Sequence, residues 1–348
     1  MSARLPPPKP WLTWVSLACL WISSGCYHGA EDTETDSATL ASTGTVDGTD
    51  GTETAAETET GETGDTETTA GEDQAELPVP SPRFYRLTHK QWEHTVRDLF
   101  RLEQETGFSE QFRSDPKASG FIFNNNALSL EVDQALWSGY QRGAADVAEL
   151  VTSDPLISAD LFPPDEGDAA QRRETFVRDF GLRAFRRPPT EAEVQTLVGL
   201  FDGALELYPS LSDEFTAGAR MVIETVLQSP MFLYRIELSS EIEGEVIPLN
   251  DWEVAQRLSY FLWDSMPDQA LFDAASSGEL TAPEQVEAQA RRMLADTRAE
   301  EVIIDYHAQL LEVEKFLSIA PSEVFFPGIS SELGAYAIEE HETFLREV

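Results

Sequence analysis

The sequence predicts a mainly α protein whose multi-helix body follows a disordered acidic stalk. From residue 83 onward, apolar residues recur every three or four positions, which is the period of one face of a helix. Helix-start signals precede several of these runs: Thr88 stands three residues before Gln91, and Thr190 three before Glu193. Only residues 245–249 hint at a strand. Helices without sheets define the mainly α class.

The first 26 residues have the order of a secretory signal. Two cations precede the apolar run 11–22, which is too short to span a membrane because a spanning helix needs about 20 residues. Ser24 and Gly25 before Cys26 resemble a bacterial lipobox, although Ser23 stands where leucine is usual. We therefore expect an exported envelope protein that a lipid on Cys26 anchors to a membrane, the outer membrane in the first instance, facing the periplasm or the exterior. A plain cleaved signal peptide with an incidental cysteine is the alternative.

Residues 27–82 form the expected stalk. Positions 27–80 contain fifteen acidic residues and fourteen threonines but no Lys or Arg. Such a segment has too few large apolar side chains to offset the loss of conformational entropy on folding. Repulsion between the carboxylates extends it. The segment is therefore expected to be a disordered linker between the membrane and the body.

The body is expected to contain three helical modules, at 83–165, 166–227 and 228–348, and the third is expected to be incomplete. Chain breaks rich in Pro, Gly and Asp separate the helical runs. One further helix start is expected at Thr281, which precedes Pro283 and Glu284. Other stretches with helical spacing are 217–227, 252–263, 300–317 and 332–348.

Composition excludes several classes of function. The chain has 24 Lys and Arg against 63 Asp and Glu, a net charge of −39, so nucleic acid is not an expected partner. Its two cysteines, Cys19 and Cys26, both lie near the start. The body therefore has no CxxCH haem attachment site and no thiolate metal site, and we expect no cofactor in this chain. The GxSxG, GxGxxG, Walker and HExxH motifs are also absent.

Four histidines in the body are possible metal ligands or acid–base groups. His89 and His94 are five residues apart, about 140° on a helix, so they do not chelate one ion by themselves. His307 lies at the edge of an apolar stripe, and His341 lies among glutamates with apolar neighbours one turn away. Both are candidate functional residues, although packing and hydrogen bonding explain such positions more simply.

Three arginines and a tryptophan complete the candidate list. Arg183, Arg186 and Arg187 stand at a helix end just before Pro188, where cations complement the helix dipole. They could instead bind an acidic partner or substrate in bidentate fashion. Trp263, with its aromatic neighbours, could stack on sugars, but at helical spacing such rings are more often core.

Several sequence blocks resemble one family. Residues 84–92 and 95–100 resemble the "RLT…TVRDL" opening of planctomycete-type surface proteins, which carry consecutive domains of unknown function, often beside c-type cytochrome modules. Residues 180–190 resemble the second module of that family, and 227–237, 257–268 and 292–296 resemble the third. Residues 309–311 read Gln-Leu-Leu where the family has Gln-Trp-Leu. The family also continues past the point that corresponds to Val348, so we expect this chain to be an N-terminal portion.

Three functions remain open at this stage. The first is an envelope-anchored interaction module, and the resemblance implies that its partner is a c-type cytochrome or another envelope electron-transfer protein. The acidic body fits this partner, because it attracts a basic docking face. The second is an enzyme that degrades extracellular polymer with carboxylate acid–base residues, which a concave pocket containing a carboxyl of raised pKa would favour. The third is a purely structural surface protein.

Overall fold

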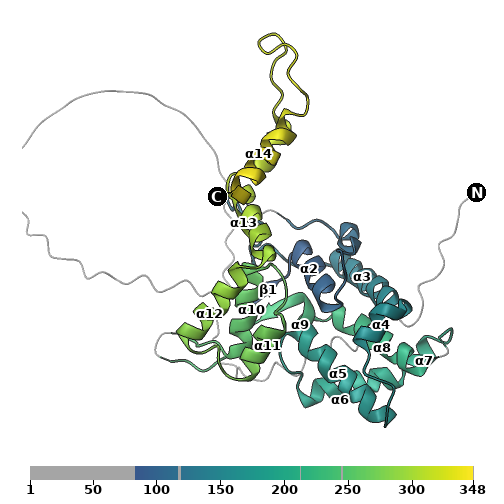
Figure 1. Cartoon of the computed structure of the whole chain (residues 1–348). Coiled ribbons are helices and arrows are strands. Elements are labelled where there is room, and N and C mark those ends of the chain that lie inside the picture. The colour runs from purple at the N-terminus through teal and green to yellow at the C-terminus, as the bar shows by residue number, and fades with distance from the viewer. Residues whose placement is uncertain (1–82, 117–118, 212, 244–245, 348) are drawn as a thin grey trace, which may run out of the picture. The chain divides into compact units, whose positions relative to one another are not determined.

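Helices make up most of the body, as the apolar spacing predicts (Figure 1). The computed structural model describes residues 83–116, 119–211, 213–243 and 246–347. The expected signal peptide, Cys26 and the stalk lie outside these residues. The first two thirds of the described chain form the helices α2 (His89–Leu99), α3 (Gln134–Ser153), α4 (Pro155–Leu161), α5 (Ala169–Phe185), α6 (Glu191–Asp202), α7 (Ala204–Leu207), α8 (Glu214–Leu227) and α9 (Pro230–Leu233).

The last third contains α10 (Asp251–Leu262), α11 (Gln269–Ser276), α12 (Pro283–Leu294), α13 (Thr297–Leu310) and α14 (Leu333–Glu347). Two 3₁₀ helices are described, η1 (Phe108–Gln111) and η2 (Val313–Ser318). None of the described helices is both long enough and apolar enough to cross a membrane.

Local sequence sets most helix starts. The predicted capping boxes form at α2 and α6, where Thr88 bonds reciprocally with Gln91 and Thr190 with Glu193. The helix expected to start at Thr281 forms as α12, but it begins at Pro283 after Ala282, and no side chain caps it. Proline itself fixes this start, because its ring presets the first helical φ.

The single helix expected over 300–317 is also wrong. Helix α13 ends at Leu310, and Glu312 then adopts a left-handed backbone with φ of 51° before η2 begins. The apolar spacing continues through this break, which is why periodicity alone did not locate it.

Two short strands replace the one that the sequence suggested. Strand β1 (Phe84–Arg86) pairs antiparallel with β2 (Tyr234–Ile236), and Tyr85 lies opposite Arg235. In the expected region, described residues form only one isolated bridge, between Glu243 and Val246. Strands of three residues are too short to give an alternating pattern, so the sequence could not reveal them.

One apolar core joins the expected modules. It contains side chains from α2, α3, α5, α6, α8 and α11, among them Trp92, Val147, Phe180, Val222 and Phe272. Helix α8 packs against α3, α5 and α6. A smaller cluster around Trp263, Leu271 and Met293 joins α10, α11 and α12. The expected module boundaries therefore do not separate independent cores, and they stay predictions.

Candidate functional site

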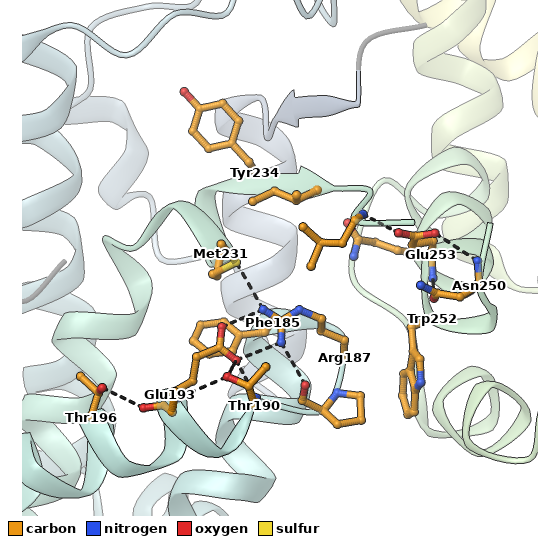
Figure 2. A pocket seen from close by; sticks show the side chains of 15 residues that line it. Phe185, Arg187, Thr190, Glu193, Thr196, Met231, Tyr234, Asn250, Trp252 and Glu253 are labelled. Atoms are coloured by element: carbon orange, nitrogen blue, oxygen red, sulfur yellow. Dashed lines mark hydrogen bonds and ion pairs between the residues drawn. The ribbon is translucent and has the colours of Figure 1, made fainter. Parts of the chain in front are cut away.

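Two cavities in the described part of the chain differ in whether the charged side chains on their walls have hydrogen-bond or ion-pair partners. The first has a volume of about 430 Å³ and lies beside the end of α5, α6 and the start of α10 (Figure 2). Arg187 forms two bonds to Glu193, of 3.0 and 2.7 Å. Although burial opposes it, hydrogen bonds from Arg187 and Thr190 lower the pKa of Glu193.

Glu253 on the other side of this first cavity is also saturated. Its carboxylate accepts bonds from the backbone amides of Leu238, Ser239 and Asn250, at 2.5, 2.8 and 3.0 Å. The carboxylates of Glu193 and Glu253 are therefore committed to holding the fold, which leaves the first cavity without an available charged group.

The second cavity is larger, about 670 Å³, and helices from distant parts of the sequence enclose it. Its wall includes the start of α2, the segment 123–125, β2, the end of α10 and much of α13. The polar groups on this wall are Thr88, Lys90, Gln91, Asn124, Asn125, Arg235, Tyr260, Asp264, Asp305, Tyr306, His307 and Gln309.

Asp264 is the acid of this second cavity. It follows α10 with a left-handed φ of 54°, a conformation that costs free energy for any residue with a side chain. Gln91 donates a hydrogen bond of 2.6 Å to its Oδ1, and His94 Nδ1 lies 3.3 Å from its backbone oxygen. Burial raises the pKa of Asp264, and the charge of Asp305 acts in the same direction. Strain and a perturbed carboxyl in a cavity together indicate a functional position.

Arg235 is the cation of the same wall. Strand β2 carries it, and its guanidinium lies 5.0 Å from the Tyr85 ring and 5.2 Å from the Tyr260 ring. Its Nε is buried and has no hydrogen-bond partner among the described residues. Burial lowers the pKa of Arg235. No carboxylate of the described chain forms an ion pair with it, so a half-buried positive charge faces this part of the cavity.

Contacts from α13 close the far side. Lys90 lies 3.5 Å from Asp305, which also accepts a 2.7 Å bond from Gln309. The Phe123 and Tyr306 rings are stacked, 5.3 Å apart and 14° from parallel. These contacts attach α13 to α2 and to the segment 123–125.

The structure gives the four histidines different surroundings. His307 lines the second cavity, and its Nδ1 is 2.8 Å from the Ile303 carbonyl, so it is in part a helix hydrogen-bonding group. His341 is half-buried in α14, with an Nε2 that lacks a hydrogen-bond partner among the described residues. His89 approaches Asp115 at 3.1 Å, whereas His94 approaches Glu105 at 3.1 Å. The two therefore face different partners.

The structure does not bring the three candidate arginines together. Arg183 donates to the Leu99 carbonyl at the end of α2, and Arg187 pairs with Glu193. Arg186 is fully buried and donates to the carbonyls of Met231, Phe232 and Tyr234, at 2.9, 3.0 and 2.8 Å. Arg183 and Arg186 thus cap the ends of other helices rather than their own.

Trp263 belongs to the core. It is 1% exposed and donates from Nε1 to the Met293 carbonyl at 3.0 Å. Arg298 stacks on its face, 3.6 Å from the ring centroid. The neighbouring Asp264 faces the cavity instead.

Sequence reasoning missed Asp264 and Arg235. One signal for Asp264 was present, because an aspartate directly after an apolar helix end suits a left-handed position better than most residues do. Arg235 gave no signal, since only the folded chain shows that it lacks a carboxylate. No group of three or more His, Cys, Asp or Glu suited to a metal ion occurs among the described residues.

The fold is thus a helical body with a main core, a smaller apolar cluster and a cavity lined from several segments. Three family models match it in consecutive order, each described as a protein of unknown function: DUF1587 over 85–153, DUF1595 over 172–237 and DUF1592 over 249–348. The chain therefore carries the consecutive domain arrangement of the planctomycete-type family. Neither curated proteins nor solved structures give a match.

The three matched regions meet at the second cavity. Gln91 comes from the first, Arg235 from the second, and Asp264 from the third. Ligand sites commonly form where domains join. This cavity is therefore the candidate functional site.

Proposed function

We propose that this protein is an envelope-anchored interaction module that docks a basic electron-transfer protein of the c-type cytochrome class. The observation that carries the proposal lies in residues 311–347, which we call the C-terminal segment. Its Val324, Phe325 and Phe326 side chains are 84, 78 and 58% exposed. Adjacent exposed apolar side chains, two of them aromatic, are typical of interaction surfaces.

Charge in the C-terminal segment supports the same partner. Its exposed carboxylates are Glu312, Glu314, Glu323, Glu332, Glu339, Glu340, Glu342 and Glu347, against the cations Lys315 and Arg346. An apolar centre with an acidic surround complements a basic surface that has an apolar centre, and the opposite fields accelerate encounter. The resemblance to proteins that often stand beside c-type cytochrome modules supports the same class of partner.

A capture experiment tests the docking proposal. Full-length protein is immobilised and exposed to solubilised envelope and, separately, to a purified basic c-type cytochrome, and haem absorbance is read in the eluate. We expect capture that weakens between about 50 and 300 mM salt, as screening shortens the reach of charge. The pair Phe325→Ser and Phe326→Ser is expected to lower capture at least tenfold.

Matched variants complete that experiment. Leu156 on α4 is 84% exposed, so Leu156→Ser removes an exposed apolar group elsewhere and should leave capture unchanged. Capture of no haem protein, or equal loss in both variants, contradicts the proposal. A second copy of the chain as the occupant would appear as a concentration-dependent dimer in light scattering.

The membrane anchor is a separate part of the proposal. We infer that Cys26 carries the lipid, because small residues precede it at the end of a short apolar run. Cys26→Ser is expected to move the protein from the membrane fraction to the soluble fraction after alkaline washing. Unchanged membrane retention would contradict lipidation at this residue.

Asp264 favours a second candidate function, the degradation of extracellular polymer. A carboxyl whose pKa burial raises is suited to act as a general acid, and Asp305 lines the same cavity. We expect the full chain to release reducing ends from envelope polysaccharide, and Asp264→Asn to lower that rate about 100-fold or more. The exposed Glu103→Gln serves as the control. Absence of release by the unmodified protein would dismiss this candidate.

A further inference from the structure

Arg235 in the second cavity forms no ion pair with the described chain, although the charge of Asp264 acts on it and opposes the burial that lowers its pKa. A guanidinium taken out of water stays charged at any physiological pH and is costly to bury unless an anion or several carbonyls surround it. Arg186 meets this requirement with three backbone carbonyls. Arg235 has two tyrosine faces and no hydrogen bond to the described chain.

Carboxylates near Arg235 are already engaged. Arg235 also lines a neighbouring cavity of about 320 Å³ that holds Glu237 and Glu253. Glu237 forms a 2.6 Å ion pair with Arg257, while Glu253 is saturated by backbone amides. In the larger cavity Asp305 pairs with Lys90, and Asp264 accepts a hydrogen bond from Gln91 and forms no ion pair with Arg235.

Most of the remaining wall of the larger cavity is apolar. Rings come from Phe123, Tyr260, Phe261 and Tyr306, and aliphatic groups from Leu262, Leu294, Ala299, Val302 and Ile303. Its volume, about 670 Å³, lies within the range of small-molecule sites. A ligand that fits must therefore combine an anionic group with an apolar body.

We propose that this cavity binds a monocarboxylate with an apolar, ring-sized body, and that Arg235 is its ion-pair partner. The planar guanidinium bonds a carboxylate in bidentate fashion. The amides of Gln91 and Asn125 lie on the same wall and can bond polar substituents. This binding proposal depends on neither the docking function nor the hydrolase function proposed above.

A carboxylate fits better than a phosphate. The wall presents one unpaired cation, because Lys90 is shared with Asp305. It also presents two carboxyl groups, Asp264 and Asp305, which repel a dianion more strongly than a monoanion. Inorganic phosphate is accordingly a competitor that should bind weakly or not at all.

Calorimetric titration of the full-length protein tests the site. Cinnamate is the carboxylate probe, cinnamyl alcohol its uncharged counterpart, and inorganic phosphate the alternative anion. We expect cinnamate to bind at least tenfold more tightly than the alcohol, the difference that one charge-assisted pair supplies. Arg235→Gln should lower cinnamate affinity at least tenfold and leave binding of the alcohol unchanged.

Two further variants keep the result interpretable. Arg257→Gln removes an arginine that is already paired and should leave cinnamate binding intact. Val302→Phe narrows the cavity without touching Arg235 and should weaken both probes. Circular dichroism checks that each variant is folded.

Four outcomes overturn the proposal, and the first three concern cinnamate. They are no cinnamate binding by the unmodified protein up to about 5 mM, equal affinity for acid and alcohol, and unchanged cinnamate affinity in folded Arg235→Gln. Tighter binding of phosphate than of cinnamate would mean that the site prefers another anion. That outcome would also contradict the proposal. The titration measures neither haem capture nor turnover. Failure of the docking or hydrolase proposal would therefore not change the outcome of this binding test.

Discussion

The two cavities contain the same kinds of charged residue, arginine and carboxylate, but these residues differ in their hydrogen-bond and ion-pair partners. In the smaller one, Arg187 pairs with Glu193, and backbone amides surround Glu253. In the larger one, Arg235 forms no ion pair with the described chain and its Nε has no hydrogen-bond partner there, and burial raises the pKa of Asp264. Satisfied groups hold a fold together, whereas groups left unsatisfied at a cavity wall lower stability and so call for a ligand or a reaction to explain them.

Arg186, which is buried, and Arg235, which is half-buried, provide the sharpest test of this comparison, because both contact Tyr260. Arg186→Gln removes the donor to three buried carbonyls and should lower the free energy of unfolding by about 3 kcal/mol. Arg235→Gln breaks no hydrogen bond and should change stability by less than about 1 kcal/mol, or increase it. Denaturant unfolding of the full-length protein measures both. Equal losses in the two variants would remove the distinction.

A medium effect is expected at Glu253 in the smaller cavity. Glu253→Gln replaces an all-acceptor carboxylate with an amide whose NH₂ faces backbone N–H donors. We expect the free energy of unfolding to fall by about 2 kcal/mol. Glu287 forms an exposed ion pair with Arg291, so Glu287→Gln is the matched control and should cost less than about 0.5 kcal/mol. A loss at Glu253 no larger than the control's would mean that the smaller cavity's wall is not structural.

The smallest effect should come from Asp264→Asn. Folding raises the pKa of this carboxyl, so the protonated carboxyl stabilises the folded state relative to the unfolded state. That stabilisation is lost as pH rises through the folded pKa. Asparagine stays neutral, accepts the Gln91 bond and tolerates the left-handed backbone. At pH 7 the variant should therefore be slightly more stable, by about 1 kcal/mol or less.

That difference should disappear below about pH 4, where Asp264 is protonated in the folded and unfolded states. Comparing the two proteins at each pH cancels titrations that they share. The charged or titratable groups that act on Asp264 from neighbouring elements are Lys90, His94, Arg235 and Asp305. A variant that is less stable at pH 7 would indicate that the ionised carboxylate is needed by the fold.

The sequence by itself determined the helical class and most helix starts. The reason is local: apolar residues at helical spacing bury one face, and Thr88 and Thr190 bond to amides three residues away. Blocks matched in order also identified the family. Local patterns failed where they carried no distinguishing signal, as in the break after Leu310 and the three-residue strands β1 and β2.

Tertiary structure alone decided the candidate site. Whether an arginine is paired depends on residues far away in the chain, so nothing near Arg235 in the sequence distinguishes it from Arg186. The same holds for Asp264, whose pKa is set by burial and by side chains from α2 and α13. Periodicity reports which face of a helix is buried, but the charges that meet across a cavity are fixed only by how the helices pack.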